Sequence, residues 1–204
     1  MIDDSTTALI VVDMQNDFCS EEGFYGRQGM PIPPVRRAIE SLSRLRDSLR
    51  DRGVIVVYTR LVHNPAVADI HERHRILPTK WVGEHRRLEP GTWGAAIIDE
   101  LTPLPDEAVF EKSDYSAFFA TGLEAYLRRR GVRTLVLTGT VDYACVLHTA
   151  FDAFCRDFDV LVPRDCVSGW YPDLGQAALR MVELLIGRVV SGPELLDLLV
   201  RRQP

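Results

Sequence analysis

The sequence predicts an α/β fold in which helices cover both faces of a parallel sheet, giving a three-layer α/β/α sandwich. Short apolar, β-branched runs alternate along the chain with segments of helical periodicity, which is typical of strand–helix–strand units. Right-handed crossovers between parallel strands then place helices on both faces of an open sheet. The 204 residues contain no repeat, linker or low-complexity segment. We therefore expect one domain covering residues 1–204.

Six apolar runs predict the strands. The first, ALIVVDMQ at residues 8–15, is continuous enough to be buried on both faces. The other five are VIVVYTR at 54–60, AVFEK at 108–112, TLVLTG at 134–139, FDVLVP at 158–163 and RVV at 188–190. Together they predict a Rossmann-like, six-stranded parallel sheet.

Helical periodicity fills the intervals between these runs. Apolar residues recur at helical spacing from Val35 to Leu49, and Gly53 marks the end of that helix. The remaining predicted helices cover 118–130, a segment from about 143, 173–186 and 192–199. Residues 61–92 show no regular pattern, and a loop of that length is usually functional.

Composition limits the classes of function. The chain has 24 basic and 29 acidic residues and a net charge of −5, which argues against a general nucleic-acid or anionic-membrane binder. No apolar run approaches the roughly 18 residues that span a bilayer, and the acidic N-terminal stretch is unlike a signal peptide. The four cysteines lack disulfide or zinc spacing. We therefore expect a cytoplasmic protein with reduced thiols.

Three residues able to do chemistry stand at the carboxyl ends of predicted strands, where open α/β sheets bind ligands. Asp13 ends the first run, Lys112 ends the third and Cys145 follows the fourth. A helix N-terminus and Lys112 would lower the pKa of the Cys145 thiol, while Asp13 could exchange its proton. Each residue alone also has a structural explanation: a packed thiol, a turn-forming aspartate and a surface lysine.

Three segments in this order resemble the isochorismatase-like cysteine hydrolases: ALIVVDMQNDF at 8–18, FEKSDYSAFFATGL at 110–123 and LVLTGTVDYACVLHTAFDAF at 135–154. The resemblance runs from about residue 7 to 199 and is weakest across 61–88. It implies a six-stranded parallel sheet and a catalytic triad of Asp13, Lys112 and Cys145.

The resemblance also implies a cis peptide between Thr140 and Val141, and an oxyanion hole built from the amides of Val141 and Cys145. The implied reaction is attack by Cys145 on a carbonyl, loss of ammonia or an amine, and hydrolysis of the thioester by water.

Within that superfamily, EPGTWGAAIIDEL at 89–101 followed by KSDYSAFFATGLEAYLR is most similar to the ureidoacrylate, biuret and N-carbamoyl amidohydrolase branch. That branch cleaves small ureido or carboxamide compounds. Arg60 could pair with a substrate carboxylate or form a surface salt bridge, and Phe18 and Phe119 could instead be core residues. The candidate substrate-binding residues are Gln15, Phe18, Arg60, Trp93, Tyr115 and Phe119.

We expect neither a metal nor a cofactor. Metal-binding nicotinamidases resemble one another in an Asp-x-His motif after the second strand, where this chain reads Thr59-Arg60-Leu61. The HERH stretch at 71–74 does not have the HExxH spacing. His63 and His85 are interpreted as loop or pocket-rim residues.

The residues around Cys145 depart from the family pattern. Asp142 and Tyr143 replace a common Thr-Asn pair, and His148 lies one turn after the cysteine. A carboxylate facing the site would raise the pKa of the thiol, whereas capping the following helix is the other role open to Asp142. His148 is either an auxiliary base or a packed, hydrogen-bonded side chain.

The sequence is compatible with three functions. The favoured one is a cysteine-dependent amidohydrolase acting on a small carboxamide, ureido or carbamoyl compound. The alternatives are vinyl-ether hydrolysis of the isochorismatase type, which needs no thiol, and a catalytically silent binding module. The expected partners are a small-molecule substrate and further copies of the chain in a dimer or tetramer, which the resemblance implies.

Overall fold

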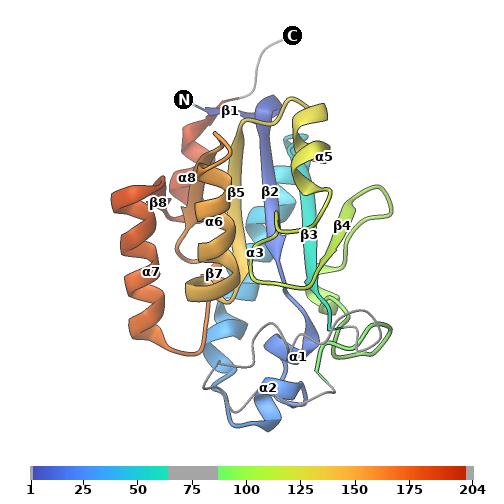
Figure 1. The fold of residues 1–204 in the computed structure, drawn as a ribbon. Coiled ribbons are helices and arrows are strands. Elements are labelled where there is room, and N and C mark those ends of the chain that lie inside the picture. The colour runs from blue at the N-terminus through green and yellow to red at the C-terminus, as the bar shows by residue number, and fades with distance from the viewer. Residues whose placement is uncertain (1, 64–86, 201–204) are drawn as a thin grey trace.

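The computed structural model describes residues 2–63 and 87–200, and a parallel sheet runs through the centre (Figure 1). The strand order is β4-β3-β2-β5-β6-β8, with a short seventh strand, β7, paired to β5. Every pair in this sheet is parallel. The strands are β2 (Thr7–Val12), β3 (Ile55–Leu61), β4 (Ala108–Lys112), β5 (Thr134–Thr140), β6 (Asp159–Pro163), β7 (Val167–Ser168) and β8 (Arg188–Val190).

Helices cover both faces of this sheet, which confirms the predicted three-layer arrangement (Figure 1). One face packs against α3 (Pro33–Asp51) and α8 (Gly192–Leu198). The other packs against α5 (Leu123–Arg129), α6 (Leu147–Phe154) and α7 (Pro172–Leu185). None of the helices described is long and apolar enough to cross a membrane.

The central strand β2 shows why the sequence folds this way. All of its residues are buried, and alternate side chains enter different cores. Leu9 and Val11 join the core beneath α3, whereas Ala8, Ile10 and Val12 join the core beneath α5, α6 and α7. A continuous apolar run is what a strand buried on both faces requires, and the strand predicted within residues 8–15 is confirmed, although it ends at Val12.

Helix α5 begins at Leu123, five residues later than the predicted start at 118. The Thr121 hydroxyl donates to the carbonyl of Ala117 at 2.6 Å and accepts the N–H of Leu123 at 3.3 Å. Ala120 has a positive φ of 54°. These local bonds stabilise a turn before the helix, because a threonine hydroxyl competes with helical hydrogen bonding.

Several short elements carried no periodic signal in the sequence. They are too brief to show helical or strand spacing over several residues. A two-stranded sheet pairs the ends of the described chain. The elements are β1 (Ile2–Asp3), η1 (Asp4–Thr6), α1 (Asn16–Cys19), α2 (Phe24–Arg27), η2 (Asp99–Leu101), β7 and β9 (Leu199–Val200).

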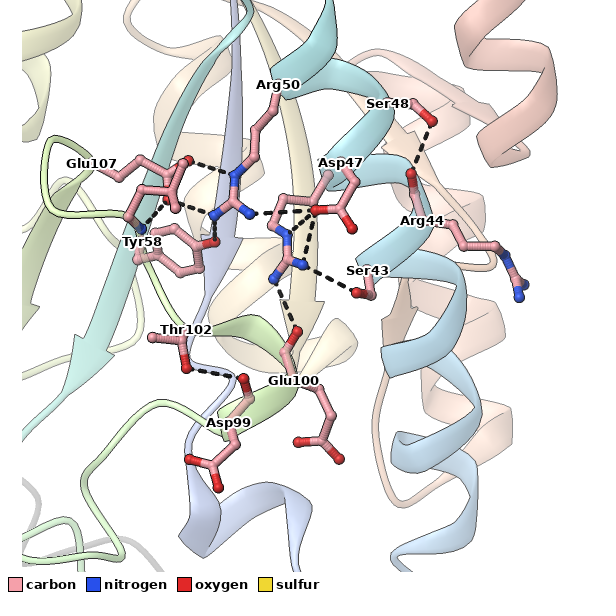
Figure 2. A network of polar contacts seen from close by, with 12 residues as sticks. Ser43, Arg44, Asp47, Ser48, Arg50, Tyr58, Asp99, Glu100, Thr102 and Glu107 are labelled. Carbon is pink, nitrogen blue, oxygen red and sulfur yellow. Dashed lines mark hydrogen bonds and ion pairs between the residues drawn. The ribbon is translucent and has the colours of Figure 1, made fainter.

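A polar network fixes the strand that carries Lys112 against α3 (Figure 2). Arg50 of α3 donates to both carboxylate oxygens of Glu107, at 2.8 and 2.6 Å, and to the hydroxyl of Tyr58 at 3.0 Å. Arg46 donates to the carbonyl of Glu100 at 3.0 Å. Because Glu107 directly precedes β4, these bonds hold the start of that strand against α3.

Residues 64–86 include the HERH stretch and His85, which therefore lie outside the described residues, as does most of the irregular segment predicted at 61–92.

Candidate active site

Three side chains from separate strand ends meet at one edge of the sheet. Asp13 follows β2, Lys112 is the last residue of β4, and Cys145 lies in η3 (Asp142–Val146), a π-helical turn after β5. Figure 1 shows α1 and α2 at this same edge. The carboxyl ends of parallel strands therefore bring residues more than 130 positions apart in the chain into one cluster.

The Lys112 ammonium contacts both of the other side chains. Its Nζ lies 2.6 Å from Asp13 Oδ2 and 3.5 Å from Cys145 Sγ. The third contact is a hydrogen bond of 2.8 Å to the carbonyl of Asp114. The side chains of Asp13 and Lys112 have no exposed surface, so their ion pair is strengthened by the low local dielectric.

Thr59 binds one carboxylate oxygen of Asp13, Oδ1, and leaves the other, Oδ2, facing Lys112. The Thr59 hydroxyl donates to Oδ1 at 2.7 Å, and the Asp13 amide donates to the Thr59 carbonyl at 3.2 Å. Asp13 has a φ of 49°, in the left-handed region that aspartate tolerates better than most residues. Among the described residues, Oδ2 has its ion-pair partner Lys112 but accepts no well-aligned hydrogen bond. A lone pair of Oδ2 is thus open to a proton.

Burial dominates the pKa of the thiol. It raises the pKa of Cys145 to about 12, although the Lys112 charge lowers it, and the Asp13 charge adds to the rise. This corrects the expectation of a thiol whose pKa is lowered at rest. Burial alone would lower the pKa of Lys112, but the charges of Asp13 and Cys145 outweigh it and raise that pKa.

The turn before Cys145 is tightly packed. The peptide bond between Thr140 and Val141 is cis, at the position that the family resemblance implies. The Thr140 hydroxyl donates to the carbonyl of Ser168 at 3.0 Å. Gly139 has a φ of 102°, and a Cβ there would lie 2.1 Å from the carbonyl oxygen of Val12. Glycine is required because β5 approaches the backbone of β2 closely just before the turn.

Two candidate substrate-binding residues are buried in the structural framework. Gln15 is fully buried; its amide donates to the carbonyls of Leu61 and Ala95, both at 2.9 Å, and accepts the Leu61 N–H at 2.8 Å. Phe18 stacks on Tyr25, with ring centroids 5.0 Å apart. The structure thus gives Gln15 a role in joining β3 to the segment before η2, and gives Phe18 a place in the core.

The other four candidates lie nearer the surface. Trp93, Tyr115 and Phe119 are 55%, 42% and 49% exposed. Arg60 forms an ion pair with Glu111 on the neighbouring strand, which is the salt bridge weighed as its alternative role. Tyr115 lies beside the ring of His148, at 5.1 Å between centroids.

The three unusual residues near the cysteine have distinct environments. Val141 is the N-cap of η3, and the Asp142 carboxylate accepts the N–H of Tyr143 at 2.8 Å, so Asp142 supports the first turn without being the cap residue. The His148 ring is exposed, and its Nδ1 lies 2.8 Å from the carbonyl of Ala144. Burial, Lys112 and Asp13 account for the pKa of the thiol, with no contribution from Asp142 among those causes.

Sequence reasoning missed residues that support the site. Thr59 anchors Asp13, but a threonine inside a strand carries no functional signal by itself. Tyr25 and Trp170 form an aromatic cluster with Phe18, the centroids of the first two lying 4.4 Å apart. Trp170 is 145 positions from Tyr25, so only the fold reveals this contact. Within residues 2–63 and 87–200, no group of three or more metal-ligating side chains is found.

Comparison with known proteins identifies the family. The isochorismatase domain model matches residues 7–194, which is most of the chain. The chain belongs to the isochorismatase family. Ureidoacrylate amidohydrolase RutB from Methylorubrum extorquens is 33% identical over 198 residues, covering 92% of this chain and 80% of the relative.

Solved structures of this family share the fold. A cysteine hydrolase from Pseudomonas syringae pv. phaseolicola superposes with a TM-score of 0.84 at 25% identity, covering 96% of this chain and 93% of the other. N-carbamoylsarcosine amidase from Thermoplasma acidophilum gives a TM-score of 0.73 at 28% identity, with 92% and 96% covered. Nicotinamidase PncA from Bacillus subtilis gives 0.76 at 28% identity, with 91% and 99% covered.

Proposed function

We propose that this chain is a cysteine-dependent amidohydrolase that cleaves a small ureido, carbamoyl or carboxamide compound and releases ammonia or an amine. The observation that carries the proposal is the contact of one buried ammonium, Lys112 Nζ, with both Asp13 Oδ2 and Cys145 Sγ. The names of the relatives support the reaction class, since they include ureidoacrylate amidohydrolase, N-carbamoylsarcosine amidase and nicotinamidase.

The proposed reaction begins with a neutral thiol. Because burial raises the pKa of Cys145 to about 12, the nucleophile forms by transfer of the thiol proton to Asp13 as the sulfur attacks the carbonyl. Asp13 then donates that proton to the departing nitrogen, and the carbon–nitrogen bond breaks to leave a thioester. Water, deprotonated by Asp13, hydrolyses the thioester and restores the thiol.

The amides of Val141 and Cys145 are the proposed donors to the oxyanion. Their nitrogens flank the turn that presents the thiol, and Cys145 lies in the first turn of a continuous π- and α-helical segment. Helix N-termini favour negative charge. Loss of one such donor typically lowers the rate of an acyl transfer by about 10²–10³.

The two alternatives differ from the amidase in what they require of the thiol. Vinyl-ether hydrolysis would use the aspartate and leave Cys145 without a chemical task, and a silent binding module would need none of the three. The Lys112–Cys145 contact favours the amidase, because an ammonium in contact with a thiol stabilises the thiolate that acyl transfer generates.

A cytoplasmic location and assembly into a homo-oligomer stay predictions.

A screen for ammonia release over ureido, carbamoyl and carboxamide compounds tests the proposal. The wild type should hydrolyse a subset, and Cys145→Ala should be inactive on every hit. Cys155→Ala, which removes an exposed free thiol, is the matched control and should retain activity. Full activity of Cys145→Ala would refute the covalent route, and hydrolysis of isochorismate by that variant would favour the vinyl-ether reaction. Mass spectrometry of acid-quenched enzyme should detect the acyl adduct on the peptide that carries Cys145.

A further inference from the structure

Arg87 lies at the edge of the sheet that carries the triad. The carbonyl of the next residue, Leu88, accepts the N–H of His63 at 3.0 Å, and the N–H of Val62 donates to the carbonyl of Lys112 at 2.9 Å. Leu88 is fully buried. The consecutive residues Val62 and His63 therefore link the backbone of Lys112 to that of Leu88, which directly follows Arg87.

A second bond fixes this segment on the other side. The N–H of Leu88 donates to Asp17 Oδ2 at 2.7 Å, and the N–H of Phe24 donates to Oδ1 of the same carboxylate at 2.8 Å. Asp17 belongs to α1, four residues after Asp13. The backbone at Arg87 is thus tied both to the end of β4 and to the segment that follows β2.

The guanidinium of Arg87 is oriented by the ring of His63. Its Nε donates to Nδ1 of His63 at 3.3 Å. Among the residues that the structure describes, no carboxylate pairs with its two terminal nitrogens. Arg87 is half-buried, and a guanidinium is the side chain that binds carboxylates through two parallel hydrogen bonds.

Two tyrosine hydroxyls lie within the electrostatic reach of both Arg87 and the thiol. Burial raises the pKa of Tyr25 to about 12 and also raises the pKa of Tyr115. For both hydroxyls, the charge of Arg87 acts to lower the pKa and the charge of Cys145 acts to raise it. The charges of Arg87 and Cys145 therefore both reach the two tyrosine hydroxyls.

The other arginine considered for this role has a different orientation. Thr59 turns its side chain towards Asp13, and successive residues of a strand point to opposite faces, so Arg60 points away from the triad. Its guanidinium is paired with Glu111. Arg60 is therefore a natural control for Arg87.

We propose that Arg87 binds a carboxylate on the part of the substrate remote from the scissile carbonyl, which makes the chain selective for anionic ureido or carbamoyl acids. The inference rests on the proposed function, because it assigns the specificity of the same site. Lys112 is already paired with Asp13, so it does not supply this second positive charge. Arg87 is a specificity residue in this scheme and takes no part in bond breaking.

The test compares each acid that the ammonia-release screen finds with its neutral methylamide, starting from N-carbamoylglycine. The wild type should have the lower KM for the acid. Arg87→Gln should raise KM for the acid by about ten- to a hundredfold, the range expected for a lost charge-assisted hydrogen bond, and change kcat/KM for the methylamide by less than about threefold. Arg87→Lys keeps the charge but lacks the two parallel N–H donors, so its KM for the acid should lie between those of the wild type and Arg87→Gln. Arg60→Gln should leave the preference unchanged.

The outcomes separate this inference from the proposed function. A wild type that prefers the neutral methylamides, or an Arg87→Gln variant equally impaired on both substrates with an unchanged melting temperature, would overturn the role of Arg87 and leave the amidase intact. If no compound of either charge is hydrolysed, the proposed function fails. Calorimetric titration of the same acids into the wild type and Arg87→Gln then tests carboxylate binding by Arg87 alone. Weaker binding by the variant supports that role, and equal or absent binding overturns it.

Discussion

Replacing Asp142 by asparagine should stabilise the protein at neutral pH and have little effect in acid. The Asp142 carboxylate lies between two glycines: a Cβ at Gly169 would be 2.4 Å from its Oδ1, and a Cβ at Gly175 would be 2.4 Å from its Oδ2. Burial in this space raises the pKa of Asp142 from 3.8 to about 6, and the N–H of Tyr143 offsets only part of the effect.

The sign and size of the effect follow from proton linkage. Between pH 3.8 and about 6 the folded protein binds a proton at Asp142 that the unfolded chain has lost, so stability falls as pH rises through this window. Each tenfold change in proton affinity is worth about 1.4 kcal/mol, so the total loss is about 3 kcal/mol. Asparagine has nearly the same shape and does not ionise, so Asp142→Asn should avoid this loss.

Urea unfolding of both proteins at pH 4, 5, 6 and 7.5 measures the difference directly. The stability of Asp142→Asn relative to the wild type should increase by about 2–3 kcal/mol between pH 4 and 7.5, with most of the change complete by about pH 7. Asp173→Asn removes the same charge at an exposed position in the first turn of α7 and is the control for the change in net charge. A difference for Asp142→Asn that is constant across the pH range would refute the reasoning.

Three further substitutions probe the site and its support. Lys112→Met should lower the free energy of unfolding by about 3–5 kcal/mol and abolish activity, because it leaves the buried Asp13 carboxylate unpaired; equal stability by denaturant unfolding would contradict this. Thr59→Val removes the hydrogen bond to Asp13, so kcat should fall about tenfold or more, and an unchanged kcat would show that this bond does not orient the carboxylate. Gly169→Ala places a Cβ within 3 Å of side chains in η3 and should lower the melting temperature, an effect that Gly122→Ala, with its nearest neighbour at 3.7 Å, should not reproduce.

The sheet and the meeting of Asp13, Lys112 and Cys145 could be predicted because both follow from local pattern and one rule of topology. Each of the six runs is apolar and β-branched enough to stand out, and β4 and β8 have the predicted bounds. Ligand sites in such folds lie at the carboxyl ends of the strands, and this rule alone predicts that Asp13, Lys112 and Cys145 lie together. The support given by Thr59 depends on the register between β2 and β3, and no local pattern encodes that register.

The properties of individual groups were harder to predict because they depend on distant residues. The helix N-terminus and Lys112 suggested a lowered pKa for Cys145, but complete burial has the larger effect and raises it. The environment of Asp142 is set by Gly169 and Gly175, which lie more than 25 positions further along the chain. The place of Arg60 at a strand end suggests a role in the site, although the alternation of side chains along the strand turns it away from Asp13.

A buried, protonated thiol is compatible with the proposed mechanism because the reaction keeps the number of charges in the site constant. Transfer of the proton from Cys145 to Asp13 moves the negative charge from a carboxylate to a sulfur without adding a second one. Lys112 Nζ lies 2.6 Å from the first position of that charge and 3.5 Å from the second, so the same ammonium stabilises both states. A permanent thiolate beside the Asp13 carboxylate would place two negative charges next to one positive charge in a low-dielectric interior, which is costly. In the proposed mechanism, the raised pKa of Cys145 and the shared contact of Lys112 act together, so that the thiolate forms only while substrate is being attacked.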